Sequence, residues 1–100
     1  MVVPYLKKKK MYQLLCSLAE GQLDTMKNAS YKFYRGSEWL VCVSKNKEFD
    51  KKYELYHCGY FFSLDISEWS ECEDEYIEID RITYKMVNNQ LVKEYQRTEA

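Results

Sequence analysis

The sequence predicts an α+β domain, with one N-terminal helix packed on a twisted antiparallel sheet of about five or six strands. Apolar residues at helical spacing predict the helix, and successive segments of alternating apolar and polar residues predict the strands. The chain also contains ten tyrosines and one proline, which favours strands over loops. Its 100 residues suit a single core. We expect a basic flexible arm at residues 1–10, the domain at 11–96 and a frayed tail at 97–100.

The predicted helix covers residues 11–20. Its apolar face consists of Met11, Leu14, Leu15 and Leu18, with Cys16 and Ala19 at the margins. These positions recur every three or four residues, so they lie on one side of a helix. Gly21 follows directly, and glycine readily takes the left-handed conformation that ends a helix. We expect the helix to begin near Lys10, because the positive end of its dipole disfavours the lysines at 7–10. A longer helix with Pro4 in its first turn is the alternative.

Alternation with a period of two predicts the strands, and turn residues bound them. The predicted strands are residues 22–27, 31–35, 38–44, 53–64, 75–80, 82–87 and 90–95. Turns are expected at 28–30 and at Gly36, a polar loop at 45–52, and Gly59 marks a bulge, bend or turn within its long segment. Apolar residues on both faces of segment 38–44 indicate a central strand.

Residues 65–74 are expected to form a short helix or an irregular loop, because Ile66 and Trp69 fall at helical spacing among carboxylates. The segment that follows alternates well. We therefore expect Ile77 and Ile79 to point inward, and Tyr76, Glu78 and Asp80 to point outward.

A two-residue turn at Asn88-Asn89 predicts a C-terminal hairpin, since asparagine tolerates the positive φ angles that such turns require. The resulting register pairs Val87 with Gln90, Met86 with Leu91, and Ile82 with Tyr95. One face of the hairpin is then consistently apolar, which supports this register.

Charge is unevenly distributed along the chain. Residues 1–52 contain eleven Lys/Arg and five Asp/Glu, a net of +6, whereas residues 53–100 contain four and eleven, a net of −7. The two halves either neutralise each other in the fold or form separate basic and acidic faces. We interpret the lysine run at 7–10 as solvated, in preference to a nucleic-acid or phosphate contact.

The cysteines and the single histidine give little indication of catalysis or metal binding. With no secretory leader or Cys-x-x-Cys spacing, Cys16, Cys42, Cys58 and Cys72 indicate free thiols in a reducing cytoplasm; a disulfide framework is the alternative. His57 precedes Cys58, and neighbours on a strand point to opposite faces, so we expect Cys58 buried and His57 at the surface or hydrogen-bonded. No phosphate loop, dinucleotide fingerprint or serine elbow is present, so we expect no enzyme, metal or cofactor.

Three segments together resemble a known group of proteins. They are the helix with Leu14, Leu15, Leu18, Ala19 and Gly21, the lysine- and tyrosine-bearing hairpin after it, and the acidic strand at 74–80. Over residues 11–80 this layout resembles small, largely uncharacterised accessory proteins of phages and prophages of Gram-positive bacteria. Those proteins often begin where Met11 stands and end in a charged tail, so residues 1–10 and 82–95 depart from the pattern. The resemblance implies a phage-encoded protein that acts in the host cytoplasm against a host system.

An acidic segment with large aromatic residues is the predicted partner-binding surface. Eight carboxylates lie within the sixteen residues 65–80. The predicted contact residues are Glu68, Trp69, Glu71, Glu73, Asp74, Glu75, Tyr76 and Glu78. The segment suits docking to a basic surface, so we predict a non-enzymatic inhibitor of a host protein, for example one that acts in defence or nucleic-acid processing. A merely solvated acidic face is the alternative.

The aromatic residues leave two further functions open. The aromatic residues expected in the core are Tyr31, Phe33, Trp39, Phe61 and Phe62. Outward tyrosines such as Tyr56 and Tyr76 are then available for an interface. The alternatives are a homo-oligomer that sequesters a nucleotide or small ligand among outward tyrosines and lysines, and a structural phage component. Direct nucleic-acid binding is less favoured, and no membrane contact is expected.

Overall fold

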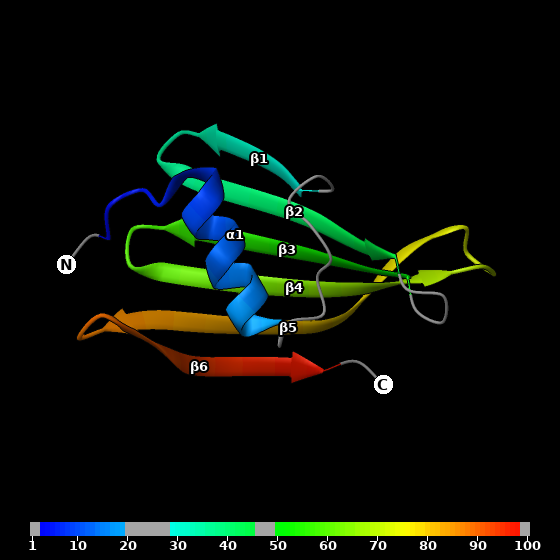
Figure 1. The fold of residues 1–100 in the computed structure, drawn as a ribbon. Helices are drawn as coiled ribbons and strands as arrows, with labels where there is room; N and C mark the ends of the chain where they lie inside the picture. The colour runs from blue at the N-terminus through cyan, green and yellow to red at the C-terminus, as the bar shows by residue number, and fades with distance from the viewer. Residues whose placement is uncertain (1–2, 20–28, 46–49, 99–100) are drawn as a thin grey trace.

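The computed structural model describes residues 3–19, 29–45 and 50–98. These residues form one helix and six strands: α1 (Lys7–Leu18), β1 (Ala29–Tyr34), β2 (Ser37–Lys45), β3 (Asp50–Cys58), β4 (Phe61–Ser70), β5 (Glu75–Val87) and β6 (Gln90–Thr98). The strands pair antiparallel in chain order from β1 to β6, and α1 lies across one face of the sheet (Figure 1). The predicted fold class is confirmed.

Helix α1 begins earlier than predicted. It starts at Lys7, so the lysine run forms its first turn and is not an arm ahead of the helix. The carboxylate of Glu38 on β2 explains the difference, because it accepts hydrogen bonds from the backbone N–H groups of Leu6 and Lys7 and places an anion at the positive helix end. The predicted stop at Gly21 and strand at 22–27 lie outside the described residues.

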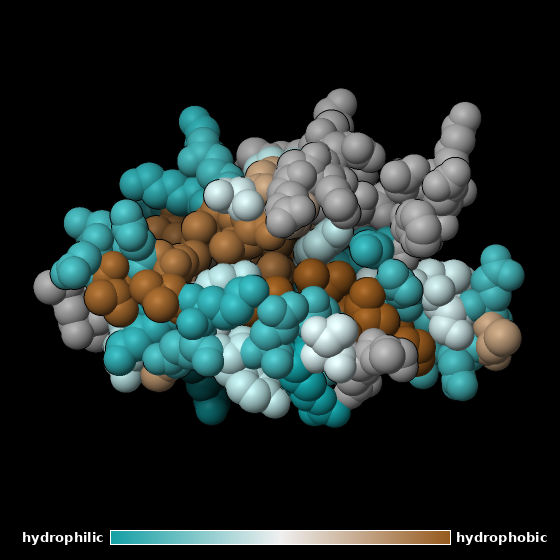
Figure 2. Space-filling model, turned by 90° about the horizontal axis from the view of Figure 1, so that it is seen from below, coloured by the Kyte–Doolittle hydropathy of each residue, from teal (hydrophilic) through white to brown (hydrophobic). Residues whose placement is uncertain are grey.

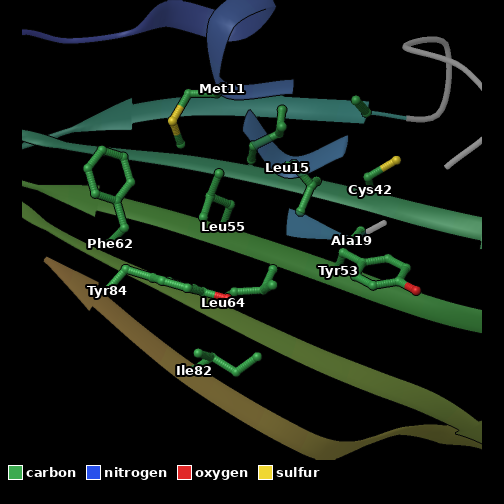
Figure 3. Packing of buried hydrophobic residues seen from close by; sticks show 12 residues of the cluster. Met11, Leu15, Ala19, Cys42, Tyr53, Leu55, Phe62, Leu64, Ile82 and Tyr84 are labelled. Atoms are coloured by element: carbon green, nitrogen blue, oxygen red, sulfur yellow. The ribbon is translucent and has the colours of Figure 1, made fainter. Parts of the chain in front are cut away.

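The core lies between α1 and the sheet. Met11, Leu15 and Ala19 point from the helix toward side chains of the inner strands (Figure 3). The buried residues on the strands are Ala29, Leu40, Cys42, Tyr53, Leu55, Phe62, Leu64, Ile82 and Tyr84. Full burial of one large apolar side chain stabilises a fold by roughly 1.5–3 kcal/mol, so this single layer of contacts supplies much of the driving force.

The opposite face of the sheet, which we call the open face, has no described element packed on it, and this corrects the predicted aromatic core. Phe62 is buried and Tyr31 is partly buried on the helix side. In contrast, Phe33 is 51% exposed, Phe61 is 45% exposed, and Trp39 is half-buried on the open face. Because side chains alternate along a strand, Trp39 and Phe61 lie on the face that α1 does not cover. Phe33 lies on the same face as Tyr31, where its ring meets that of Tyr5 with centroids 4.7 Å apart.

Residues 65–70 belong to β4, so the predicted short helix or loop is wrong. Residues 65–68 pair on both sides, for example Asp65 with Glu54 on β3 and with Arg81 on β5, and residues 69 and 70 pair with β5. This double ladder satisfies the backbone and outweighs the helical spacing of two apolar residues. The chain turns at residues 71–74. Ile77 is 37% exposed and not buried as predicted, because the hairpin extends past the part of the sheet that the helix covers (Figure 1).

Several turns agree with prediction, whereas strand ends differ. Gly36 and Gly59 have φ angles of 81° and 63° in the two-residue turns before β2 and β4. Strand β1 already includes residues 29 and 30, where a turn was expected, and β2 and β3 extend into the expected loop at 45–52. Strand β2 lies second in the sheet and pairs with β1 and β3, so it is an interior strand, as its two apolar faces predict.

The C-terminal hairpin turns at Asn88 and Asn89, with φ angles of 51° and 64°, as predicted. The pairs Val87–Gln90 and Met86–Leu91 are confirmed. A bulge between residues 83 and 84 then shifts the register, so that Tyr95 pairs with Thr83 and not with Ile82. Strand β6 continues to Thr98, so residues 96–98 are paired in the sheet.

Seen from the β6 side, apolar side chains gather in a band along the molecule with polar side chains around it (Figure 2). Partly buried residues packed against the core include Leu14, Leu18, Ile66, Met86 and Leu91.

Among the described residues, no helix has the length and hydrophobicity required to cross a bilayer.

Candidate functional site

All eight predicted contact residues lie on the hairpin formed by the end of β4, the turn at 71–74 and the start of β5. We call residues 68–78 the acidic hairpin. Its tip projects beyond the ends of the neighbouring strands (yellow in Figure 1). The fold therefore gathers these residues on one protruding element, although residues 65–70 form a strand and not the predicted short helix or loop.

An aromatic pair stabilises the acidic hairpin. Trp69 and Tyr76 face each other across β4 and β5, with ring centroids 5.1 Å apart and an interplanar angle of 74°. Such edge-to-face pairs contribute about 0.5–1.5 kcal/mol beyond the area that they bury. The Trp69 side chain still remains 40% exposed, and Ile77 next to Tyr76 is 37% exposed. The hairpin thus presents apolar surface to solvent.

The base of the acidic hairpin is partly neutralised, whereas its tip is not. Lys51 Nζ lies 3.7 Å from Glu68 Oε1, and Arg81 Nη2 lies 3.0 Å from Glu78 Oε1. Lys52 Nζ lies 5.1 Å from the centre of the Tyr76 ring. At the tip, Glu71, Glu73, Asp74 and Glu75 are all exposed, and none forms an ion pair with a described residue. Cations therefore neutralise part of the negative charge at the base of the acidic hairpin, whereas its tip remains acidic.

A second cluster, not predicted from the sequence, lies buried beneath the start of α1. Glu38 is fully buried, and His57, opposite it on β3, is 1% exposed. Glu38 Oε2 lies 2.6 Å from His57 Nδ1, and the Tyr31 hydroxyl donates to Glu38 Oε1 at 2.8 Å. The alternation of side chains along β2 indicates that Glu38 is buried, because Glu38 precedes Leu40 and Cys42 at intervals of two on the buried face.

The hydrogen bonds of this cluster stabilise a charged carboxylate. Burial acts to raise the pKa of Glu38, but hydrogen bonds from Leu6 N–H, His57, Lys7 N–H and the Tyr31 hydroxyl lower it below its ordinary value. His57 Nε2 lies 2.9 Å from the Gly59 carbonyl oxygen. Glu38 and the Gly59 carbonyl therefore engage both ring nitrogens of His57.

This cluster caps the start of α1 and is packed against an aromatic ring. The His57 ring stacks on Phe62, with centroids 4.3 Å apart and planes 2° apart. Cys58 points to the other face and is exposed, so the expectation that it is buried is wrong. Cys58 follows Tyr56 by two positions on β3, so both side chains lie on the open face, which no described helix covers. His57 is hydrogen-bonded, as one of the two predicted alternatives has it, and it is buried. The buried face of β3 continues as far as the turn at residues 59–60.

Within the described ranges, no three His, Cys, Asp or Glu side chains are grouped so as to hold a metal ion. Cys16, Cys42, Cys58 and Cys72 are free thiols.

The open face contains a hollow of about 660 Å³ beside the turn that joins the end of β1 to the start of β2. It is lined by Lys32, Phe33, Tyr34, Arg35, Ser37, Trp39 and Tyr56. Trp39 and Tyr56 stack across β2 and β3, with ring centroids 5.4 Å apart and planes 12° apart. The Lys32 ammonium lies 5.4 Å from the centre of the Trp39 ring.

The chain was compared with known protein families, curated proteins and solved structures. None of them matches it.

The hollow was missed in the sequence for a physical reason. Large aromatic residues are usually buried, so the sequence predicts Trp39 and Phe33 in the core, whereas α1 leaves the face of Trp39 uncovered by any described element. A signal was present in the alternation, which places Trp39 on the face opposite Leu40. The neighbours of Trp39 across the sheet, Lys32 and Tyr56, follow only from the register.

Proposed function

We propose that this chain is a non-enzymatic binding protein that docks through its acidic hairpin onto a basic surface of a host protein and inhibits that protein. The observation that carries the proposal is the exposed Trp69 beside four carboxylates without ion pairs to described residues, all on a protruding hairpin. The phage origin and the host target come from the resemblance in the sequence.

The chemistry of the acidic hairpin supports docking to a protein. Tryptophan and tyrosine are frequent anchors of interfaces, because they contribute a large contact area with few rotamers to freeze. Tyr76 holds the Trp69 ring at its edge, so this anchor is largely ordered before binding. The carboxylates at the tip attract a basic partner and raise the rate of encounter.

The state of the single histidine supports a non-enzymatic role. His57 is 1% exposed, and both of its ring nitrogens are engaged by Glu38 and Gly59. A general base must reach the proton that it removes from a substrate, which this ring does not do.

Affinity purification from a Gram-positive host lysate, with quantitative mass spectrometry, tests the function. We expect the parent chain to enrich at least one host protein, and the triple variant Glu71→Lys, Glu73→Lys, Glu75→Lys to lose it. Glu94→Lys reverses an exposed charge on β6 and is the matched control, which should retain the partner. Equal recovery by the parent and the triple variant, or no enrichment by the parent, would contradict the proposal.

Trp69→Ser separates the aromatic anchor from the charges. We expect this variant to weaken capture while the carboxylates remain, because truncation of a central aromatic anchor commonly costs about 2 kcal/mol or more. Circular dichroism of both hairpin variants should match the parent, since the tip lies outside the core.

A further inference from the structure

The register places a row of side chains across the open face. Lys32 pairs with Trp39, Trp39 with Tyr56, and Tyr56 with Ser63, which in turn pairs with Thr83. Residues that are paired in this way stand side by side on the same face. The row therefore begins with a cation, continues with two stacked rings and ends with two short side chains.

The main hollow lies at the cationic end of this row. The short side chain of Ser37 lies between two aromatic rings of this hollow. Ser37 pairs with Tyr34 on β1 and precedes Trp39 by two positions on β2. Tyr34 is 68% exposed, so its ring is open to a ligand. A second hollow of about 180 Å³ lies on the other side of Tyr56, over Ser63 and Thr83.

Positive charge borders the aromatic rings of the main hollow. The Lys32 ammonium lies 5.4 Å from the Trp39 ring, and the Arg35 guanidinium carbon lies 5.1 Å from the Tyr34 ring. Neither cation forms an ion pair with a described residue. Both charges are therefore available to an anion that enters the hollow.

Internal packing does not explain why residue 39 is a tryptophan. Its Nε1 is covered and has no acceptor among the described residues. A phenylalanine would preserve the stack with Tyr56 without leaving a buried donor unpaired. The larger indole instead adds apolar wall to the hollow, beside the exposed ring of Tyr34.

We propose that the main hollow binds a free mononucleotide, with its base against the rings of Tyr34, Trp39 and Tyr56 and its phosphate at Lys32 and Arg35. Small-molecule sites occupy roughly 300–1,000 Å³, a range that includes this hollow of about 660 Å³. The aromatic walls match a planar base, and the two cations match a phosphate. A nucleic-acid strand would instead be expected to follow a longer basic groove.

This site is independent of the docking surface proposed above. The hollow adjoins the turn between β1 and β2, whereas the acidic hairpin extends from the opposite end of the sheet (Figure 1). The triple reversal at residues 71, 73 and 75 should therefore leave nucleotide binding unchanged.

Isothermal titration calorimetry of the full chain with AMP, GMP, CMP and UMP tests the site. We expect saturable binding of at least one of them, with weaker binding of its nucleoside and no binding of ribose 5-phosphate, because base and phosphate both contribute. Absence of saturable heat with all four mononucleotides would overturn the proposal. Binding of an oligonucleotide without binding of any mononucleotide would overturn it too, and would indicate a nucleic-acid surface.

Variants locate the binding site. The double variant Lys32→Gln, Arg35→Asn should weaken the nucleotide by about tenfold or more, since it removes both charged contacts. Asparagine suits position 35, where φ is 50°. Lys93→Gln removes an exposed cation on β6 and should leave the affinity unchanged. Equal affinity of the double variant and the parent would overturn the assignment, and thermal unfolding of each variant checks that it is folded.

Discussion

Glu38 on β2 and His57 on β3 form a buried pair, with Glu38 Oε2 2.6 Å from His57 Nδ1, directly beneath the first turn of α1. The same carboxylate accepts the N–H groups of Leu6 and Lys7. One strand residue thus caps the helix and joins it to two strands. Because these groups are buried, removal of either partner leaves others without hydrogen bonds.

Glu38→Gln should lower the free energy of unfolding by about 3 kcal/mol, since it removes the charge of a buried, hydrogen-bonded pair. Urea denaturation measures this loss. Glu94→Gln changes an exposed carboxylate on β6 and should shift the free energy by no more than about 0.5 kcal/mol. Equal stability of Glu38→Gln and the parent would show that the pair does not hold the helix.

The lowered pKa of Glu38 gives the fold an acid-sensitive contribution. Its stabilising effect is complete above the ordinary value of 4.5 and is lost as the pH falls through the lower folded pKa. The parent should lose stability below about pH 4.5 more steeply than Glu38→Gln, which has no proton to gain there. Urea midpoints at several acidic pH values test this, and parallel curves would contradict it.

Tyr31 should make the free energy of unfolding fall at high pH, whereas Glu38 makes it fall at low pH. Burial, the hydrogen bond to Glu38 and the charge of that carboxylate raise the pKa of Tyr31 from 10.0 to about 12. Its contribution is present below pH 10 and is lost as the pH rises toward 12. Tyr31→Phe should remove this part of the alkaline loss, as measured by thermal unfolding between these pH values. An unchanged slope would contradict the role of Tyr31.

Leu15 tests how strongly the helix is packed on the sheet. Leu15→Ala should cost about 2–5 kcal/mol, because Leu15 is fully buried against the strands and leaves a cavity when truncated. Gln13→Ala, on the exposed side of the same helix, is the control and should change the stability little. Similar unfolding midpoints for the two variants would contradict the packing.

Local patterns predicted the fold class and most turns. The leucine stripe near residue 15, the glycines at 36 and 59, and the asparagine pair at 88 and 89 act through short-range geometry, which sequence spacing reports directly. The extension of β4 to Ser70 depended on pairing with β3 and β5, which spacing within the segment does not show.

The candidate sites depended on long-range arrangement to different degrees. The acidic hairpin was found because its residues are close in the sequence. The helix start at Lys7 could not be predicted, since its compensating carboxylate, Glu38, lies more than thirty residues away. Likewise, the hollow on the open face follows from which face α1 covers, and strand alternation is compatible with either face.

Hydrogen–deuterium exchange of the chain, alone and bound to its captured host protein, tests the docking surface most directly. We expect new protection of backbone amides in residues 68–78, with little change in α1 and on strands β1 and β2. Protection confined to the helix or the open face, with the acidic hairpin exchanging as in the free chain, would contradict the proposed function.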